Sequence, residues 1–375
     1  MPGRVLIVGG GICGLTSGIA LRQKGFPVDL VELRPDLRQQ SGIGLSLQGN
    51  SVAALARIGV AERCVRSGVP ANHIDLLRAD GALVAHQPLI PMGGPDFPGT
   101  VGISRNELHA ILLDAAETSG VAIRTGVSVD SFSADPTGVS VRFTDGRDGS
   151  YDLMVAADGA YSGIRAKLFP HIKPTFCGQA VWRAGVPRPK ETVTTELYVG
   201  GPFGIVGICP ISADEAYIYI VESAEGGTRH PEADLAALMI EKLEPYSAGR
   251  IRECAAHLPA SVGISYRPLD WLLLPPPWNR DRVVVIGDAA HCNPPVLAQG
   301  AAMGIEDAVV LAESLADEPT IELALEQFTR RRVPRASLVV NNSVQLCEWE
   351  VKHLVSPKEI GRLMTETQQA LAQPF

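Results

Sequence analysis

The sequence predicts an α/β fold in which a mainly parallel sheet is interrupted by an antiparallel sheet and followed by a helical tail. Residues 4–32 have the pattern of an apolar strand, a helix and a second strand, which is the order of a βαβ unit. Short strands of an antiparallel sheet follow from about residue 176, and a buried strand returns at 282–288. A strand of the first kind that returns after a different sheet indicates one unit interrupted by another.

The βαβ unit is defined by its apolar runs. Residues 4–8 are β-branched and apolar, as in a buried strand, and a helical pattern runs from Ile12 to Gln23. Residues 27–33 have the pattern of the next strand. An apolar stretch after Arg4 also occurs at the start of secretion signals, but the central glycines and the strand that follows disfavour that interpretation.

The rest of the chain contains helices and strands in an order that suggests three parts. Amphipathic helices are predicted at 50–60 and 105–120, with alternating strands after the second helix. Antiparallel strands follow at 180–222, then a helix near 232–248, and helical patterns continue from about residue 300. We expect a discontinuous first domain of residues 1–70, 100–175 and 266–343, a sheet domain of residues 71–99 and 176–265, and a helical tail of residues 344–375 without an assigned role.

The bulk composition disfavours several classes of function. Of the 375 residues, 46% are hydrophobic and 20% charged, as in folded enzymes. The net charge of −8 argues against nucleic acid and membranes as partners, and no apolar run reaches the length of a membrane span. The seven cysteines lack C-x-x-C pairs and the eight histidines lack metal-ligand spacing, so we expect reduced thiols, a cytoplasmic protein and no metal. His73 and His86 are interpreted as ordinary surface residues.

Three glycines lie between the first strand and the first helix. Gly9 permits a tight turn, Gly11 lets a pyrophosphate approach the backbone, and Gly14 lets the helix pack closely on the strand. The N-terminus of the helix presents free N–H groups to an anion. Glu32, at the end of the second strand, can accept hydrogen bonds from a ribose. The stretch predicts a dinucleotide site and leaves NAD and FAD both open.

Two later stretches decide between these cofactors. ADGAYSGIR at 157–165 follows a strand and begins a helix, and VVVIGDAAH at 283–291 ends a strand and leads through prolines into a glycine-led helix. With the glycine turn, the acid and an Arg-x-x-Leu helix, they stand in the order found in the single-component flavin-dependent aromatic hydroxylases, which include p-hydroxybenzoate and salicylate hydroxylases. The chain resembles that family over nearly its whole length. The resemblance implies a Rossmann-like FAD-binding domain of the glutathione-reductase type with an inserted antiparallel-sheet substrate domain.

The resemblance also implies which residues bind FAD. Glu32 would bind the adenosine ribose, Arg105 the ribityl and pyrophosphate region, and Asp288 the ribityl chain. In such enzymes Asp158 and Arg165 are linked to both FAD and NAD(P)H. A helix that begins near Gly300 would direct its positive end at the flavin. The full implied set is Gly9, Gly11, Ile12, Cys13, Gly14, Glu32, Leu33, Arg105, Asp158, Arg165, Asp288, Gly300 and Ala301.

Some of these side chains also have purely structural interpretations. Asp158 can cap a helix, Arg105 can lie on a solvated helix face, and Asp288 can form a turn after a strand. Their occurrence together, in the order of the family, favours the cofactor roles.

The family resemblance places the substrate between the inserted sheet and the flavin. Tyr217 and Tyr219 share one face of a strand by the two-residue period, but the period does not say which face is the inner one. Some relatives that act on hydroxylated pyridine acids carry a histidine at the position of Ser46, so its absence here weakens the transfer of that substrate. The predicted pocket consists of Tyr217, Pro294 and Pro295, with Ser46, Trp182, Arg183 and Tyr219 as further candidates.

The same resemblance implies a monooxygenase reaction. NADH or NADPH, as a transient co-substrate, reduces FAD, and O2 then gives a C4a-hydroperoxyflavin that hydroxylates a small electron-rich aromatic or N-heteroaromatic substrate. We expect a monomer or homodimer whose partner is that small aromatic substrate. Two alternatives stay open: another flavoenzyme on the same scaffold, such as a halogenase, epoxidase or oxidase, and a non-catalytic nucleotide-binding protein.

Overall fold

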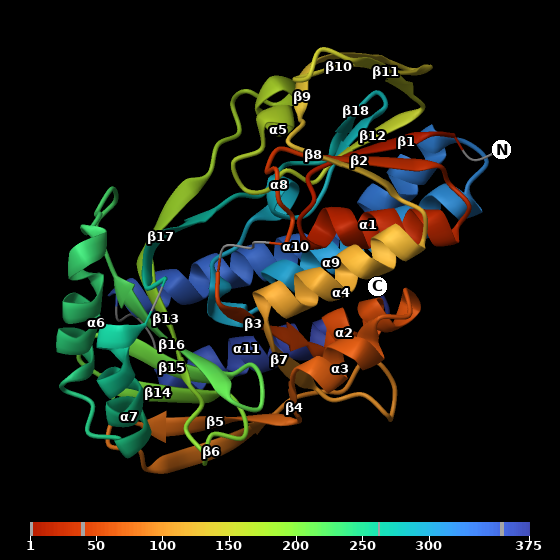
Figure 1. Ribbon diagram of the computed structural model, residues 1–375. Helices are drawn as coiled ribbons and strands as arrows, with labels where there is room; N and C mark the ends of the chain where they lie inside the picture. Colours follow the sequence, from red (N-terminus) through yellow and green to blue (C-terminus); the bar gives the residue numbers. More distant parts are fainter. Residues whose placement is uncertain (1–2, 39–41, 262, 353–355) are drawn as a thin grey trace.

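The computed structural model describes residues 3–38, 42–261, 263–352 and 356–375. It is a mixed α/β structure with parallel and antiparallel sheets and a helical C-terminal part, and this confirms the predicted fold class at that level (Figure 1). None of the helices within the described ranges is both long and apolar enough to cross a membrane.

A six-stranded sheet forms the centre of one half of the molecule, which we call the first half. Its order is β18–β19–β12–β1–β2–β8, and every neighbouring pair is parallel except β18–β19. All four residues of β1 are buried, as its unbroken apolar sequence predicts. The strands are β1 Val5–Val8, β2 Val28–Glu32, β8 Ala122–Thr125, β12 Leu153–Ala156, β18 Asn279–Arg280 and β19 Val283–Val285.

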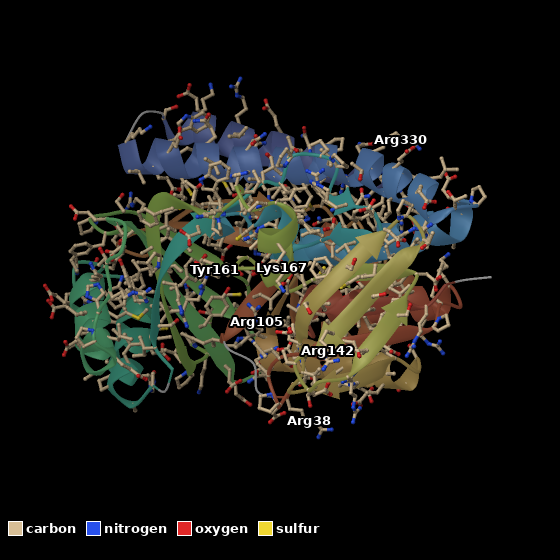
Figure 2. All side chains as sticks on the ribbon, turned by 90° about the horizontal axis from the view of Figure 1, so that it is seen from above. Arg38, Arg105, Arg142, Tyr161, Lys167 and Arg330 are labelled. Atoms are coloured by element: carbon tan, nitrogen blue, oxygen red, sulfur yellow. The ribbon has the colours of Figure 1, made fainter. Side chains whose placement is uncertain are left out.

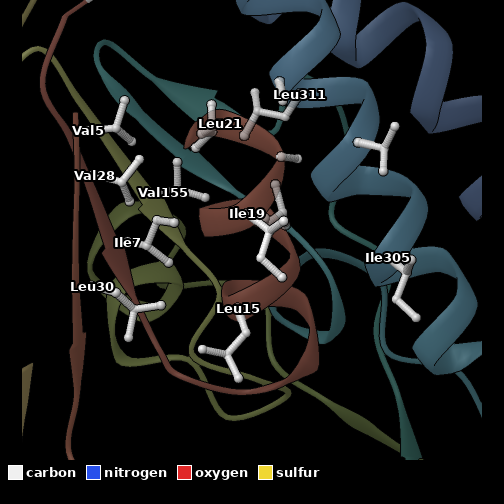
Figure 3. Packing of buried hydrophobic residues seen from close by; sticks show 14 of the residues in the cluster. Val5, Ile7, Leu15, Ile19, Leu21, Val28, Leu30, Val155, Ile305 and Leu311 are labelled. Carbon is white, nitrogen blue, oxygen red and sulfur yellow. The ribbon is translucent and has the colours of Figure 1, made fainter. Parts of the chain in front are cut away.

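Helix α1 lies between this sheet and helix α9 (Figure 3). Leu15 and Ile19 of α1 belong to the same buried cluster as Ile7 of the sheet and Ile305 of α9. This packing places the N-termini of both helices on the same side of the sheet. The helices of this half are α1 Ile12–Gln23, α2 Gly49–Arg57, α3 Ala61–Ser67, α4 Arg105–Thr118, α5 Gly163–Leu168, α8 Asp288–His291 and α9 Gly300–Asp317. Helix α10 Ile321–Lys352 packs on both α9 and β13, and α11 Pro357–Leu371 packs on α10, so these two helices extend to the other half.

A seven-stranded sheet forms the other half of the molecule. Its order is β17–β13–β16–β15–β14–β5–β6, and the neighbouring pairs are antiparallel except β14–β5, which is parallel. Helices α6 and α7 cover one face, where Trp182, Ile218 and Ile220 lie in a second buried core. The elements are β5 His73–Arg78, β6 Leu83–Pro88, β13 Thr175–Pro187, β14 Glu196–Gly201, β15 Gly204–Pro210, β16 Glu215–Ser223, β17 Ser265–Trp271, α6 Leu235–Leu243 and α7 Gly249–His257.

Two three-stranded sheets complete the fold. The sheet β3–β7–β4 contacts β15, so it connects the two halves, and the sheet β11–β10–β9 packs beside β12. Three short 3-10 turns lie in the connections. The remaining elements are β3 Gly44–Gln48, β4 Val69–Ala71, β7 Thr100–Ser104, β9 Val129–Asp135, β10 Gly138–Phe143, β11 Asp148–Tyr151, η1 Glu232–Asp234, η2 Leu258–Ala260 and η3 Pro295–Leu297.

A buried group of charged side chains holds α9 against α10. Arg332 donates hydrogen bonds to Asp307 at 2.7 Å and to Glu306, and Arg335 donates to both oxygens of Glu306 at 2.9 Å. His291 of α8 lies 2.6 Å from Asp307. Burial raises the pKa of the Asp307 carboxyl, but the charges of His291 and Arg332 outweigh it, and the net pKa lies below the ordinary value. The ionised network therefore fixes the direction of α9.

The structure differs from the sequence-based expectation at two boundaries. The helix expected near 232–248 ends earlier, because the turn η1 and helix α6 cover only residues 232–243, and a separate helix, α7, begins at Gly249. The tail expected to begin at residue 344 has no boundary there, because α10 continues unbroken from Ile321 to Lys352. Only α11 is a separate C-terminal helix.

Candidate functional site

A cavity of about 1210 Å³ lies between the two halves of the molecule. One end is lined by the glycine turn after β1 and by the start of α9. The other end lies between the seven-stranded sheet and the helices α10 and α11. The two ends are built from different elements, and this gives them different chemistry.

Each glycine of the first turn meets a different steric demand. Gly9 has a φ of 110°, and a Cβ there would lie 2.4 Å from the carbonyl oxygen of Ala157. A Cβ on Gly14 would lie 1.9 Å from the carbonyl oxygen of Gly9, so only glycine lets the helix lie this close to the strand. Gly11 lines the cavity, and a Cβ there would meet no atom within 4 Å. The backbone at Gly11 is therefore open to a ligand.

The N-termini of α1 and α9 both reach this end of the cavity. Gly11 and Gln299, the residues that precede the two helices, make no side-chain cap hydrogen bond, and neither first turn contains an acid. Ile12, Cys13, Gly300 and Ala301 line the cavity. Free N–H groups and two positive dipole ends therefore face the same space, which suits an anionic ligand such as a pyrophosphate.

Glu32 stands at the end of β2 and supports the glycine turn. Its carboxylate accepts hydrogen bonds from the backbone N–H of Gly10 at 2.7 Å and from the backbone and side chain of Arg34 at 2.9 and 3.0 Å. Burial raises the pKa of Glu32, but the hydrogen bonds from Arg34 and Gly10 outweigh it and hold the net pKa below its ordinary value. Leu33 is 67% exposed. The ribose contact of Glu32 and the cofactor contact of Leu33 stay predictions.

Asp158 and Arg165 hold two helices in place beside the cavity, and neither side chain lines it. The Asp158 carboxylate accepts a hydrogen bond from the backbone N–H of Ile164 at 3.2 Å, in the first turn of α5. Burial raises its pKa. The buried Arg165 guanidinium donates to the carbonyl oxygen of Ala289 in α8 at 2.9 Å. Ser162 is the N-cap residue of α5, and Asp158 supports the same first turn, while cofactor contacts of Asp158 and Arg165 stay predictions.

Arg105 and Asp288 both line the cavity. Arg105 begins α4, and Figure 2 shows it between the strands of the two halves. Asp288 begins α8 directly after Gly287, whose backbone N–H donates to the buried Asp307 at 2.8 Å. A cation and an anion therefore flank the end of the cavity that the two helix N-termini face.

The cavity-facing side of the seven-stranded sheet presents Arg183, Tyr217 and Tyr219. The rings of the two tyrosines lie 5.7 Å apart. Burial raises the pKa of both hydroxyls, that of Tyr217 to well above its ordinary value, so both stay protonated near neutral pH. Burial lowers the pKa of the Arg183 guanidinium, and in the described part of the chain no carboxylate forms an ion pair with it. This side of the cavity therefore offers a cation and two hydroxyl donors.

Trp182 does not lie in the cavity, which corrects the sequence-based candidate. Its neighbour Arg183 faces the cavity, so the two-residue period of β13 turns Trp182 to the opposite face. There its indole N–H donates to Glu222 at 2.7 Å and its ring stacks on His230 with centroids 5.1 Å apart. Trp182 is a core residue.

Of the remaining pocket candidates, two line the cavity and one does not. Ser46 on β3 lines the cavity, with its hydroxyl 3.4 Å from the Cys209 thiol. Pro295 lines the cavity as well. Pro294 precedes the turn η3 and is not a lining residue. The proline pair therefore contributes one wall residue and one turn former.

A polar pair at the far end, and the place of the C-terminal helix α11 in the cavity wall, were not predicted from the sequence. The amide of Gln179 on β13 donates to the Glu350 carboxyl of α10 at 2.8 Å, and both side chains line the cavity. Burial raises the pKa of Glu350. Ile360, Met364 and Gln368 bring α11 to the same wall. The capping box of Ser356 and Glu359 is the sequence signal that would have located the start of this helix.

Helix α11 is tied down by contacts from α10. Arg335 donates hydrogen bonds to the carbonyl oxygens of Leu371 and Gln373, both at 3.1 Å. The amide of Asn342 donates to the Thr367 hydroxyl at 2.7 Å. Because Arg335 also binds Glu306, the wall formed by α11 is continuous with the network that fixes α9.

Comparisons with known proteins support a flavin-binding arrangement. The family model described as FAD binding domain matches residues 3–343. The chain is 32% identical over 356 residues to aurachin C monooxygenase/isomerase of Stigmatella aurantiaca, with 92% of this chain and 90% of that protein covered. It is 31% identical over 352 residues to 2-heptyl-3-hydroxy-4(1H)-quinolone synthase of Pseudomonas aeruginosa, with 92% and 90% covered. The solved structure of Klebsiella pneumoniae HpxO complexed with FAD and uric acid has a TM-score of 0.83 at 24% identity, covering 99% of this chain and 93% of that one.

Proposed function

The chain belongs to the family of FAD-dependent monooxygenases that carry this FAD binding domain, and we propose that it hydroxylates a flat aromatic ring bearing an apolar substituent. It uses FAD, NADH or NADPH, and O2 to hydroxylate an electron-rich aromatic or N-heteroaromatic substrate. When bound, FAD accepts a hydride from NAD(P)H and activates O2 for transfer of one oxygen atom to the ring. The protein has to bind both molecules, orient them and exclude water.

We assign the end of the cavity with the helix N-termini to FAD. The open backbone at Gly11 and the start of α1 suit the pyrophosphate. Arg105 suits a phosphate oxygen and Asp288 suits sugar hydroxyls, because a guanidinium donates to anions and a carboxylate accepts from diols. The start of α9 would stabilise negative charge on the ring system.

We assign the face of Arg183 and Tyr217 to the hydroxylated edge of the substrate. A protonated Tyr217 donates a hydrogen bond to a ring hydroxyl or carbonyl oxygen. Arg183 lowers the cost of placing a deprotonated ring hydroxyl in the buried site, because its charge has no carboxylate partner among the described ion pairs. Deprotonation makes the ring more electron-rich and favours attack on an electrophilic oxygen.

The proposal of an apolar substituent on the substrate rests on the apolar residues that line the cavity beyond Arg183. The apolar side chains that line the cavity include Val181, Val199 and Ile205 of the sheet and Ile360 and Met364 of α11. A small hydroxylated acid would leave these side chains against water, whereas an alkyl or fused-ring substituent would bury them. One relative is named for a quinolone that carries a heptyl chain, and this supports the proposal.

The lining residues of the cavity also suggest which parts of the chain bind the substrate and which bind FAD. We infer that residues 71–99 and 176–265 supply the substrate half and that residues 1–70, 100–175 and 266–343 supply the FAD half. To this division we add α11 as a wall of the substrate half, because Ile360, Met364 and Gln368 line the cavity.

A chain-length series tests the substrate class. Product formation by the holoenzyme is measured by mass for hydroxyquinolones and phenols with alkyl chains of increasing length, with hydroxybenzoates as the small anionic reference. Each added CH2 is expected to raise kcat/KM by about three- to fourfold until the cavity is full. A preference for hydroxybenzoates, or no dependence on chain length, would reject the apolar substituent.

The variant Met364→Trp tests whether the apolar substituent of the substrate binds against the wall formed by α11. The larger side chain is expected to move the best substrate to a shorter chain, because it fills part of the apolar end. Glu366→Trp, on the exposed side of the same helix, is the matched control and should leave the optimum unchanged. An unchanged optimum in both variants would place the substituent elsewhere.

A further inference from the structure

The β5–β6 hairpin brings the side chains of His73 and Asp75 on one strand together with that of His86 on the other. The ligating atoms of His73, Asp75 and His86 all lie within 4.8 Å of one another. From this juxtaposition we propose that the three residues form a binding site for one divalent transition-metal ion of the zinc class. The site is distinct from the cavity and goes beyond the proposed function.

The strand register explains why the three side chains meet. Asp75 on β5 pairs directly with His86 on β6, so their side chains project from the same face. His73 is two residues before Asp75 and shares that face by the period of the strand. A His-x-Asp segment and a histidine on the partner strand thus present two imidazoles and a carboxylate to one point.

The distances are close to those of a metal centre. Zinc binds imidazole nitrogen and carboxylate oxygen at about 2.0–2.2 Å, which places tetrahedral ligand atoms about 3.3 Å apart. The Nε2 of His73 is 3.4 Å from the Oδ1 of Asp75, and the Nδ1 of His86 is 2.6 Å from the same oxygen. Insertion of an ion has to lengthen the second contact, and the side chain of His86, at 61% exposed, has room to move.

The backbone under the ligands is fixed. The N–H of Asp75 donates to the carbonyl oxygen of Thr195 at 2.9 Å, and the hydroxyl of Thr194 donates to the carbonyl oxygen of His73. Glu196 stands opposite Asp75 in the register of β14, but its carboxylate already accepts from Tyr198 and lies 3.4 Å from Arg250. The protein therefore supplies three ligands, and water completes the shell of the ion.

A metal ion bound at this site would restrict the positions of two residues in the cavity wall. Ile74 and Leu76 alternate with the ligands on β5, so they point to the other face and line the cavity. β6 is the last strand of its sheet and pairs only with β5 in the sheet order. An ion bound by both strands would clamp this edge and hold Ile74 and Leu76 in position.

Zinc titration of the EDTA-treated holoenzyme tests the site. Calorimetry should show one equivalent of Zn2+ bound per chain through the hairpin. His73→Ala and His86→Ala should each weaken this binding by more than about tenfold, since even the loss of an outer-shell partner costs 10- to 100-fold in metal affinity. His171→Ala, at an exposed position outside the cluster, is the matched control and should bind as the parent does. Equal affinity in all four proteins would overturn the proposal.

Two further measurements keep the test independent of folding and of the free cysteines. Asp75→Asn keeps the shape of the side chain and should also weaken binding, while far-ultraviolet circular dichroism and FAD content stay at the parent level. Zinc K-edge absorption of the one-equivalent complex should show a nitrogen and oxygen shell with imidazole scattering. A shell that contains sulfur would assign the ion to a thiol and overturn the proposal.

Discussion

The side-chain amide of Gln179 donates a hydrogen bond to the Glu350 carboxyl at 2.8 Å and so joins strand β13 to helix α10 at the cavity wall. The second amide atom, Oε1 of Gln179, is buried and has no hydrogen-bond partner among the described residues. An unpaired acceptor in a cavity wall is a site for a donor group of a ligand. The pair therefore gives the far end of the cavity one polar point within an apolar surface.

The raised pKa of Glu350 predicts a pH-dependent effect of Glu350→Gln on stability. Burial raises this pKa in the folded state, so the wild-type carboxyl favours folding at low pH, and this contribution is lost as pH rises through the folded-state pKa. The neutral glutamine loses nothing. We expect similar melting temperatures for the two holoenzymes at about pH 4, below the ordinary pKa of a glutamate, and a higher one for the variant at pH 8. A difference that does not change with pH would contradict the assignment.

Tyr217→Phe is expected to lower the amount of product formed per NAD(P)H consumed by about two- to tenfold. The variant removes one hydrogen bond to the substrate, worth about 0.5–1.5 kcal/mol, and leaves the ring in place. Oxygen uptake, peroxide and product are measured together with saturating substrate. Tyr161→Phe, an exposed tyrosine outside the cavity, serves as the control. Equal coupling in both variants would remove Tyr217 from the substrate site.

Asp288→Ala is expected to weaken FAD binding by about 10- to 100-fold, because a charged hydrogen bond contributes about 1.5–3 kcal/mol. Fluorescence titration of the apoprotein with FAD measures the change. Asp130→Ala, at an exposed carboxylate far along the chain from the cavity-lining segments, should bind FAD as the parent does. Unchanged affinity in Asp288→Ala would leave this residue as a turn former.

Arg335→Ala is expected to lower the free energy of unfolding by about 2–4 kcal/mol, because it removes charged hydrogen bonds to Glu306 and to the carbonyl oxygens at the end of α11. Turnover of long-chain substrates should fall more than turnover of short ones, since α11 lines the apolar end. Arg330→Ala, an exposed neighbour on the same helix, is the control (Figure 2). Equal stability of the two variants would show that α11 is held by its apolar contacts.

Local patterns were sufficient to predict the first strand and the first helix of the fold. The apolar run before Gly9 and the helix after Gly11 are decided by neighbouring residues, so strand β1 and helix α1 lie where the sequence predicts them. The cavity-lining positions of Arg105 and Asp288 match the candidates drawn from the family resemblance, while their contacts with FAD stay predictions.

Contacts between distant segments could not be predicted in the same way. The two-residue period places the side chains of Tyr217 and Tyr219 on one face of their strand, but it does not say which face of the sheet is the inner one. The same period places the side chains of Trp182 and Arg183 on opposite faces, so only one of these two candidates could line the cavity. The meeting of His73 with His86 depends on a hairpin register, and the place of α11 depends on Arg335 of α10. Such contacts leave little trace in a single sequence.

Because strand β14 pairs in parallel with strand β5, the seven-stranded sheet cannot be cut out of the chain as one contiguous segment. Glu196 aligns with Asp75, so the sheet joins segments separated by the whole of helices α4 and α5 and by strands of the other half. A fragment that began at residue 176 would expose the open edge of β14, a template for aggregation. During folding, this pairing has to wait for a long loop to close, which is a slow step by its topology. Engineering of this substrate wall therefore has to be done by substitution within the intact chain and not by exchange of a contiguous segment.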